Sequence, residues 1–208
     1  MNGLRKGGVG TKVKYLTGVY WERGSVTDKN EDSVVLLQVL TARGRVVMAA
    51  VCDGMGGLAQ GEAASGYVTR RLQEWFYESL LRAVRKKKPY WMVRRSLDRL
   101  VYHMQEQLSE YGTREGIRLG TTMTVLAVWE KTYLLWHLGD SRAYGLSGRK
   151  VRGQLFAEAV RMTKDHVYGK NQLTKCVGSF GYERPDFKMG RLQNGQAVLL
   201  CSDGFRHC

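Results

Sequence analysis

An apolar run that ends in an aspartate within a glycine-rich turn is the feature that most constrains this chain. The apolar segment Ala49–Cys52 is followed directly by Asp53-Gly54-Met55-Gly56-Gly57. The apolar residues predict the end of a buried strand, and the glycines permit a tight turn and a close approach of the backbone to a ligand. A carboxylate at a strand end can bind a hard divalent cation through its oxygen atoms. A single motif of this kind is also an ordinary turn, because Asp and Gly are favoured turn residues.

Further acidic elements repeat this arrangement along the chain. Asp140 and Asp203 each follow an apolar run, whereas Glu31 and Asp32 come just before the apolar run Val34–Leu40. Turn chemistry accounts for one such motif but poorly for the whole series. The sequence therefore predicts a composite site that binds two divalent cations, the usual arrangement for the hydrolysis of phosphate esters.

The motifs occur in a fixed order along the chain. They are N-E-D-S at 30–33, D-G-M-G-G at 53–57, G-E-A-A-S at 61–65, G-T-T at 120–122, G-D-S-R-A-Y at 139–144, T-K-D-H at 163–166 and L-L-C-S-D-G at 199–204. This series resembles the bacterial branch of the metal-dependent Ser/Thr protein phosphatases, the protein phosphatase 2C type. The resemblance assigns residues 15–208 to a phosphatase-like domain, and we expect the basic residues 1–14 to form a mobile tail.

The resemblance implies an α+β fold, a four-layer α-β-β-α sandwich of two mainly antiparallel sheets flanked by helices. The residue pattern agrees with this fold class. Short β-branched or aromatic runs bounded by turn residues predict strands at Val34–Leu40, Val46–Cys52, Met123–Trp129, Tyr133–Leu138 and Ala197–Cys201. Helices are predicted at about 59–85 and 91–111. The predicted apolar face of the first helix consists of Ala63, Tyr67, Leu72, Trp75, Phe76, Leu80 and Ala83.

The resemblance also implies roles for individual residues. Asp53 would bridge two metal ions, the backbone carbonyl of Gly54 would ligate one of them, and Asp203 would be a direct ligand. The cofactors would be two Mn²⁺ or Mg²⁺ ions. The nucleophile would be the water that bridges the ions, because two divalent cations lower the pKa of bound water. No covalent phospho-enzyme is expected.

Three other acidic residues surround this expected pair of ions. Asp32 would lie beside the metal cluster, where Glu31 and Asp32 would hold metal-bound waters. Asp140 would help to bind a third, weaker ion. On this basis Asp32, Asp53 and Asp203 are the candidate catalytic residues, with Asp32 and Asp140 also in the metal-binding set.

Several positions depart from the family pattern. The family normally has an arginine that binds the substrate phosphate where this chain has Thr27. A threonine cannot form the bidentate charge-assisted hydrogen bonds of an arginine, so the phosphate-binding residue stays unassigned. Arg23 and Lys29 are possible substitutes. Met55 stands where eukaryotic relatives have a histidine. Methionine is common at this position in the bacterial branch.

The end of the chain and the segment after His166 are also unusual. Only Val167–Lys170 separate His166 from the N-x-L-T motif at 171–174, where the family inserts a flap. The chain stops at Cys208, five residues after Asp203, whereas relatives continue to an Asp-Asn pair that supplies another ligand. We therefore expect a C-terminally truncated domain.

The favoured hypothesis is a cytoplasmic phosphatase of bacterial type that acts on phosphoserine and phosphothreonine in signalling proteins. Its partners would be phosphorylated proteins, including a Ser/Thr kinase and the substrates of that kinase. The alternative is a catalytically weak or inactive pseudophosphatase that binds phosphoproteins or a kinase. No run of apolar residues is long enough to predict a transmembrane helix. Cysteines without paired spacing suit a reducing compartment, and these are Cys52, Cys176, Cys201 and Cys208.

The formal net charge is +14. Cationic residues gather around the turn between the two predicted helices, namely Arg82, Arg85, Lys86, Lys87, Lys88, Arg94, Arg95 and Arg99. Such a patch can attract nucleic acid, anionic lipid or an acidic protein. It can also be a solvated helix face, which we favour because no nucleic-acid-binding motif accompanies it. Structural roles are expected for Asp165, His137 and His166.

Overall fold

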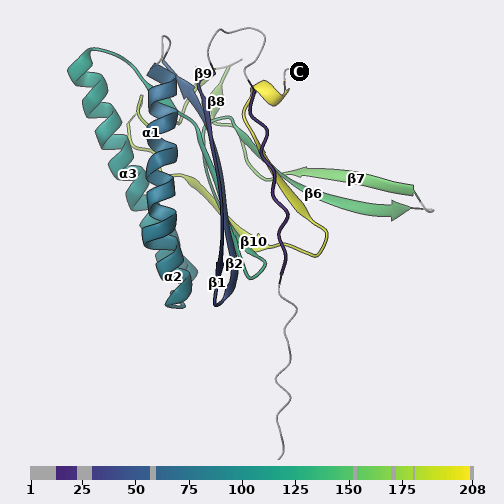
Figure 1. The fold of residues 1–208 in the computed structure, drawn as a ribbon. Coiled ribbons are helices and arrows are strands. Elements are labelled where there is room, and N and C mark those ends of the chain that lie inside the picture. The colour runs from purple at the N-terminus through teal and green to yellow at the C-terminus, as the bar shows by residue number, and fades with distance from the viewer. Residues whose placement is uncertain are drawn as a thin grey trace, which may run out of the picture.

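An antiparallel six-stranded sheet forms the centre of the molecule (Figure 1). The computed structural model describes residues 13–22, 30–56, 60–151, 154–169, 172–179 and 181–206. The strand order is β1-β2-β4-β5-β10, with the short β3 paired to the end of β2. These strands are β1 Asp32–Thr41, β2 Gly44–Met55, β3 Gly120–Thr121, β4 Met123–Trp129, β5 Thr132–Leu138 and β10 Asp186–Arg191.

The interior strands are apolar because both faces of the sheet are covered. Every residue of β4 is buried. Alternate residues of β2 face opposite sides: Val46 and Met48 pack toward the helices, and Val47 packs toward a second, smaller sheet. This two-sided burial explains why continuous apolar runs, rather than alternating ones, predicted these strands correctly.

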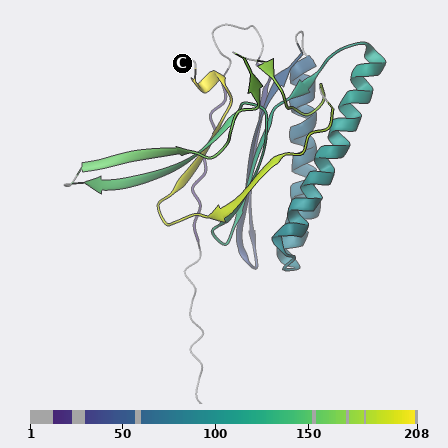
Figure 2. The ribbon, with the colours of Figure 1, turned by 180° about the vertical axis from the view of Figure 1, so that it is seen from behind.

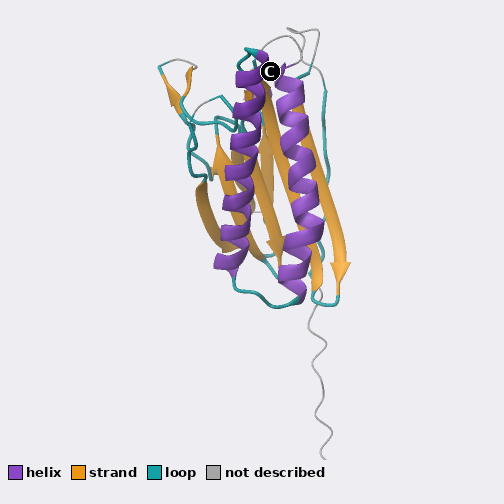
Figure 3. Ribbon diagram, turned by 90° about the vertical axis from the view of Figure 1, so that its left-hand side faces the viewer, coloured by secondary structure: helices purple, strands orange, loops and turns teal. Residues whose placement is uncertain are grey.

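A hairpin of two helical arms covers one face of the sheet (Figure 3). The first arm consists of α1 Gln60–Trp75, a π-helical turn at Phe76–Leu80 and α2 Leu81–Arg85. The second arm is α3 Tyr90–Glu115, which ends at Gly116 in the left-handed conformation. Within the described ranges, no helix has the length and apolar character needed to cross a bilayer.

The π-helical turn keeps one side of the first arm facing the sheet. Its buried residues recur every four positions, at Ala64, Val68, Leu72, Phe76, Leu80 and Val84. In a regular α-helix each four-residue step rotates the side chain by about 40°, so the row would turn away from the sheet. The wider π turn at Phe76–Leu80 rotates less per residue and compensates for this drift.

This geometry corrects part of the predicted helix face. Leu72, Trp75, Phe76 and Leu80 are buried as predicted. Ala63 is instead exposed, and Tyr67 and Ala83 are only partly buried, because the buried row passes through Ala64, Val68 and Val84.

A second sheet packs against the other face of the central sheet. Its strand order is β11-β6-β7, formed by β6 Arg142–Val151, β7 Gln154–Arg161 and β11 Ala197–Cys201. Val198 and Leu200 of β11 contact the cluster that includes Val47 and Leu126 of the central sheet. The β6–β7 hairpin extends away from the body of the molecule (Figure 2).

The α+β class with antiparallel sheets is confirmed. The described residues form a helical layer and two sheets, and α1, α2 and α3 lie on the same side (Figure 3). Five predicted strands are present, whereas β6, β7, β10 and the two-residue strands were not predicted. The remaining elements are a short hairpin of β8 Val167–Tyr168 with β9 Gln172–Leu173, and a 3-10 turn at Gly204–Arg206.

The register of the first helix can be tested with a pair of neighbouring alanines. Ala64 is fully buried, so Ala64→Gln should lower the free energy of unfolding by about 2 kcal/mol or more, through overpacking and burial of an amide. Ala63→Gln, the matched control at an exposed position, should change it by no more than about 0.5 kcal/mol. Urea denaturation measures both values. Equal losses in the two variants would contradict this helix register.

Candidate functional site

The register of the first strand pair places two carboxylates face to face. Asp32 and Asp53 lie directly opposite each other in the antiparallel pair β1–β2. Like charges in directly opposed positions destabilise a sheet. The pairing therefore creates a local excess of negative charge at this end of the sheet.

Asp140 and Asp203 add to this charge. Asp140 follows the end of β5, and Asp203 follows the end of β11. The pKa of Asp53 is raised to about 8, first by burial and then by the negative charges of Asp32, Asp203 and Asp140. The fold thus brings together the four aspartates that the sequence analysis selected, and we name Asp32, Asp53, Asp140 and Asp203 the aspartate cluster.

Asp32 has a neutral hydrogen-bond donor of its own. Burial raises the pKa of Asp32, and the charge of Asp203 raises it further. The hydroxyl of Ser202 donates a hydrogen bond of 2.7 Å to an Oδ atom of Asp32 and opposes this shift. Ser202 was not selected from the sequence, although it stands next to Asp203 in the L-L-C-S-D-G block.

Close backbone packing fixes the turn after Asp53. A Cβ atom on Gly54 would lie 2.2 Å from the carbonyl oxygen of Gly61, so this position accepts only glycine without a backbone shift. The Gly54 N–H donates to the carbonyl oxygen of Glu31 at 3.2 Å. The hydroxyl of Ser65 donates to the same carbonyl at 2.6 Å. The start of helix α1 therefore anchors both Glu31 and Gly54.

Two threonines hold the backbone of Asp53 from the other side. The Asp53 N–H donates to the Thr122 hydroxyl at 2.9 Å, and the Thr122 N–H donates to the Asp53 carbonyl at 2.8 Å. The hydroxyl of Thr121 donates to that carbonyl at 3.0 Å. Thr122 also hydrogen-bonds the hydroxyl of Ser141 at 2.7 Å, which links the Asp53 and Asp140 segments. The G-T-T block marked this segment in the sequence, but nothing there indicated these partners.

The turn that carries Asp140 is clamped at Gly139. Gly139 has a φ of +108°, and a Cβ atom there would lie 2.5 Å from the Thr122 side chain. The His166 N–H donates to the Gly139 carbonyl at 2.8 Å, and the Gly139 N–H donates to His166 Nδ1 at 3.1 Å. Thr122 and His166 thus restrict this turn from two sides.

The T-K-D-H block also holds the residues that follow Asp140. Arg142 forms a bidentate pair with Asp165, with a shortest distance of 2.6 Å, and Arg161 pairs with the same carboxylate. The Ala143 N–H donates to the hydroxyl of Thr163 at 3.0 Å. Asp165 therefore positions the chain beside the aspartate cluster through Arg142.

His137 is a buried side chain whose two ring nitrogens are both hydrogen-bonded. Its Nε2 atom lies 3.0 Å from the Lys164 carbonyl, which can only accept, so Nε2 carries the proton and Nδ1 accepts from the Thr124 hydroxyl at 2.9 Å. The ring stacks on that of His166, with centroids 4.9 Å apart. Burial lowers the pKa of His137 to about 4.

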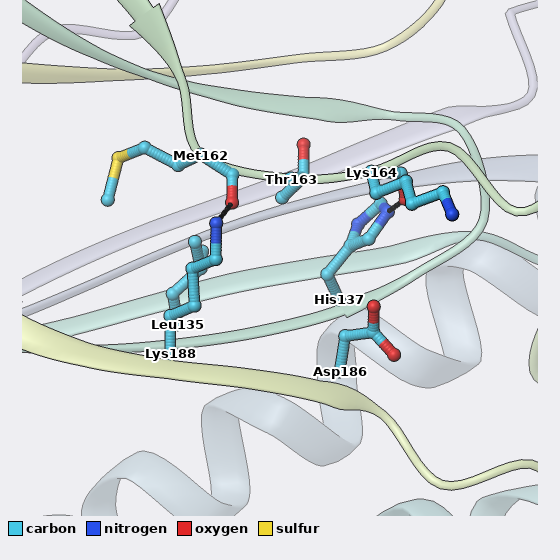
Figure 4. Close-up of a pocket in the computed structure, with 7 residues that line it drawn as sticks. All are labelled: Leu135, His137, Met162, Thr163, Lys164, Asp186 and Lys188. Carbon is cyan, nitrogen blue, oxygen red and sulfur yellow. Dashed lines mark hydrogen bonds between the residues drawn. The ribbon is translucent and has the colours of Figure 1, made fainter.

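A small cavity of about 120 Å³ lies beside His137 (Figure 4). Its lining includes Met162, Lys164, Asp186 and Lys188, and none of the residues in the aspartate cluster. In Figure 4 the imidazole of His137 points toward the Lys164 backbone, in agreement with a structural role.

Some predicted positions lie outside the described residues. These are Thr27 with its possible substitutes Arg23 and Lys29, the last glycine of the D-G-M-G-G block, and residues 1–12 of the expected tail. The prediction about phosphate binding therefore stays a prediction.

The aspartate cluster suits divalent cations by donor chemistry and charge. Carboxylate oxygens are the ligands that Mg²⁺ and Mn²⁺ prefer. Burial and then the repulsion between carboxylates raise the pKa of Asp53, and a cation placed among Asp32, Asp53 and Asp203 would offset that repulsion. Among the described residues, no three acidic, histidine or cysteine side chains already converge as ligands on one point. The fit therefore rests on the chemistry and charge of these carboxylates, not on a ready-made coordination geometry.

Comparison with known proteins gives consistent results. The family model described as Protein phosphatase 2C matches residues 25–207. Serine/threonine phosphatase stp of Listeria monocytogenes is 25% identical over 88% of this chain and 75% of its own length. Protein phosphatase PhpP of Streptococcus pneumoniae is 25% identical over 93% of this chain and 78% of its own.

Solved structures show the same similarity. The crystal structure of the catalytic domain of the serine/threonine protein phosphatase PstP in complex with two manganese ions superposes with a TM-score of 0.65 and 26% identity. That match covers 88% of this chain and 74% of the PstP domain. A bacterial serine phosphatase that carries an R161K mutation gives a TM-score of 0.72 and 27% identity, over 88% of this chain and 75% of that one.

The lowered pKa of His137 predicts a pH dependence of stability. A histidine whose pKa falls from 6.5 to about 4 on folding binds fewer protons in the folded state than in the unfolded state. Its contribution to the free energy of unfolding is therefore intact above about pH 6.5 and decreases as the pH falls toward 4. NMR titration of the histidine ring protons should find one ring with a pKa near 4, and His137→Gln should remove that signal. A value near 6.5 for His137 would contradict the buried neutral ring.

The electrostatic account of the cluster predicts opposite effects of Asp53→Asn with and without metal. In a chelator at about pH 9, above the raised pKa of Asp53, the variant should unfold at a higher temperature than the parent, by roughly 2–4 °C for each kcal/mol of repulsion removed. Mn²⁺ should raise the unfolding temperature of the parent, because it binds the folded state, but not that of the variant. Differential scanning calorimetry measures all four values. An equal Mn²⁺ shift in both proteins would place the cation elsewhere.

Proposed function

The chain belongs to the protein phosphatase 2C family, and we propose that it is a metal-dependent phosphatase that hydrolyses phosphoserine and phosphothreonine in proteins. The observation that carries this proposal is the aspartate cluster, whose members reach one end of the sheet from separate parts of the chain. We further propose that residues 15–208 act as one domain.

The aspartate cluster and its neighbours would have two functions, to bind the metal ions and to orient water. Asp53 and Asp203, with the carbonyl of Gly54, would hold two divalent cations. Asp32, oriented by the Ser202 hydroxyl, and Glu31 would orient water at these cations. Bound cations of this kind lower the pKa of water and neutralise charge that develops on phosphorus. The close packing of Gly54 on Gly61 and the threonine bonds to Asp53 would keep the carboxylates in place.

The identity and number of the ions are finer parts of the proposal. We propose Mn²⁺ or Mg²⁺ as the cofactor, with a third and weaker ion at Asp140. The PstP domain with its two manganese ions supports the choice of Mn²⁺. The contribution of Asp140 to the raised pKa of Asp53 supports its proximity to the other carboxylates.

The substrates would be phosphorylated proteins, and the opposing partner a Ser/Thr kinase. We propose a cytoplasmic location in a bacterial cell. Cys52 is a buried thiol without a disulfide, which suits a reducing compartment. The relatives named as phosphatases favour an enzyme over the alternative of a non-catalytic binding module.

The proposal predicts that single carboxylates control turnover. Asp53→Ala and Asp203→Ala should each lower Mn²⁺-dependent hydrolysis of a phosphothreonine peptide by at least about a hundredfold, because each would remove a direct metal ligand. Glu110→Ala is the matched control, since Glu110 is an exposed carboxylate on α3 and should leave turnover unchanged. Full activity in both aspartate variants would overturn the site assignment.

A further inference from the structure

A second charged surface lies far from the aspartate cluster. We name it the cationic end, and it is formed by exposed side chains around the turn between α2 and α3. These side chains are Arg82, Arg85, Lys86, Lys87, Lys88, Arg95 and Arg99. Arg94, which the sequence placed in the same group, is instead partly buried against the ring of Phe187.

Contacts of Tyr90 place this surface at the opposite end of the central sheet. The ring of Tyr90 packs on that of Trp129 with centroids 5.1 Å apart, and its hydroxyl hydrogen-bonds Thr132. Trp129 pairs with Val46, near the start of β2, whereas Asp53 lies near the end of that strand. The seven residue-to-residue steps from Val46 to Asp53 span about 24 Å in an extended strand. Figure 1 shows α2 at the end of the helical layer near the start of β2.

The charges of the cationic end are not neutralised within the described part of the chain. None of its residues forms an ion pair there, whereas Arg43 and Arg184 elsewhere are paired with Glu130 and Asp98. The nearest acidic residue that precedes Arg82 in the first helical arm is Glu78, and these two side chains form no ion pair. A group of uncompensated cations on one surface attracts an anionic partner.

Exposed apolar side chains accompany these cations. Trp91 is 61% exposed and Met92 is 37% exposed, while the neighbouring Tyr90 faces the sheet. Trp91, Arg95 and Arg99 recur every four residues, so they form one row along the solvent side of α3. An exposed tryptophan beside lysine and arginine is the combination found where proteins meet the interface of a bilayer.

We propose that the cationic end docks on the surface of an anionic lipid bilayer, with Trp91 and Met92 at the level of the headgroups. A nucleic acid would use the cations and could stack on Trp91, but it would leave Met92 without a partner. A bilayer interface uses all of these side chains. Each cation close to an anionic surface strengthens such binding by about fivefold. The aspartate cluster, at the other end of the sheet, would face away from the membrane and stay accessible to phosphoproteins.

Vesicle sedimentation at physiological salt tests this proposal. The probes are vesicles of phosphatidylcholine alone and vesicles of phosphatidylcholine with phosphatidylglycerol at about two to one. The chain should sediment only with the anionic vesicles. Lys87→Gln combined with Lys88→Gln should weaken this binding about tenfold or more. Trp91→Ala should weaken it as well, and quenchers placed in the lipid should reduce the fluorescence of the parent but not of this variant.

The matched control combines Arg70→Gln with Arg114→Gln, which removes the same charge from exposed positions outside the cationic end. It should bind as the parent does, and both double variants should keep their circular dichroism spectra and unfolding temperatures. The proposal is overturned if the parent does not bind anionic vesicles, or if both double variants lose binding equally. It is also overturned if the parent binds a single-stranded oligonucleotide more tightly than the vesicles, because the surface would then be a nucleic-acid site.

Discussion

The repulsion between aspartates at one end of the central sheet is the constraint on which the rest of the structure depends. Asp32 and Asp53 are opposed across β1 and β2, and Asp203 and Asp140 approach the same place. Burial makes this arrangement more costly, as the raised pKa of Asp53 shows. A fold keeps such a cluster only when surrounding contacts hold the carboxylates in place. A divalent cation would neutralise their charge and bind favourably among them.

The surrounding contacts are almost all made by small residues. Gly54 packs on Gly61 at a distance that excludes any side chain, and Thr122 hydrogen-bonds the Asp53 backbone and the hydroxyl of Ser141. His166 restrains the backbone of Gly139. The family motifs that seem unrelated in the sequence therefore form one supporting layer behind the carboxylates. The apolar faces of the helices then secure this layer by covering the sheet.

The parts of the fold predicted from the sequence are those with an unambiguous pattern. The apolar runs at β2 and β4 predicted buried strands, and the order of the motifs predicted the aspartate cluster. The hairpin of β6 and β7 was missed because glycine and charged residues in it break the apolar pattern, and β10 was missed because it is an exposed edge strand. The buried face of α1 includes Ala64 and not Ala63 because, in a regular helix, Ala63 lies about 180° around the axis from the buried Leu72, whereas Ala64 lies about 80° from it.

Contacts between distant residues set the other limit on prediction from sequence. The bond between Thr122 and Ser141 and the bond between Ser202 and Asp32 join residues far apart in the chain, so no local pattern reveals them. The same applies to the absence of ion pairs at the cationic end within the described ranges, where the sequence favoured a solvated helix face over a binding surface. Charge was visible in the sequence, but the exposure of Trp91 and Met92 beside it was not.

The central claim is that the aspartate cluster is a site for two neighbouring divalent cations. Electron paramagnetic resonance of the chain titrated with Mn²⁺ tests it most directly. The account predicts a spectrum of two spin-coupled Mn²⁺ ions per chain, because carboxylates shared between ions hold them about 3.5–4 Å apart. A spectrum of isolated bound Mn²⁺, or of free Mn²⁺ alone, would contradict the account.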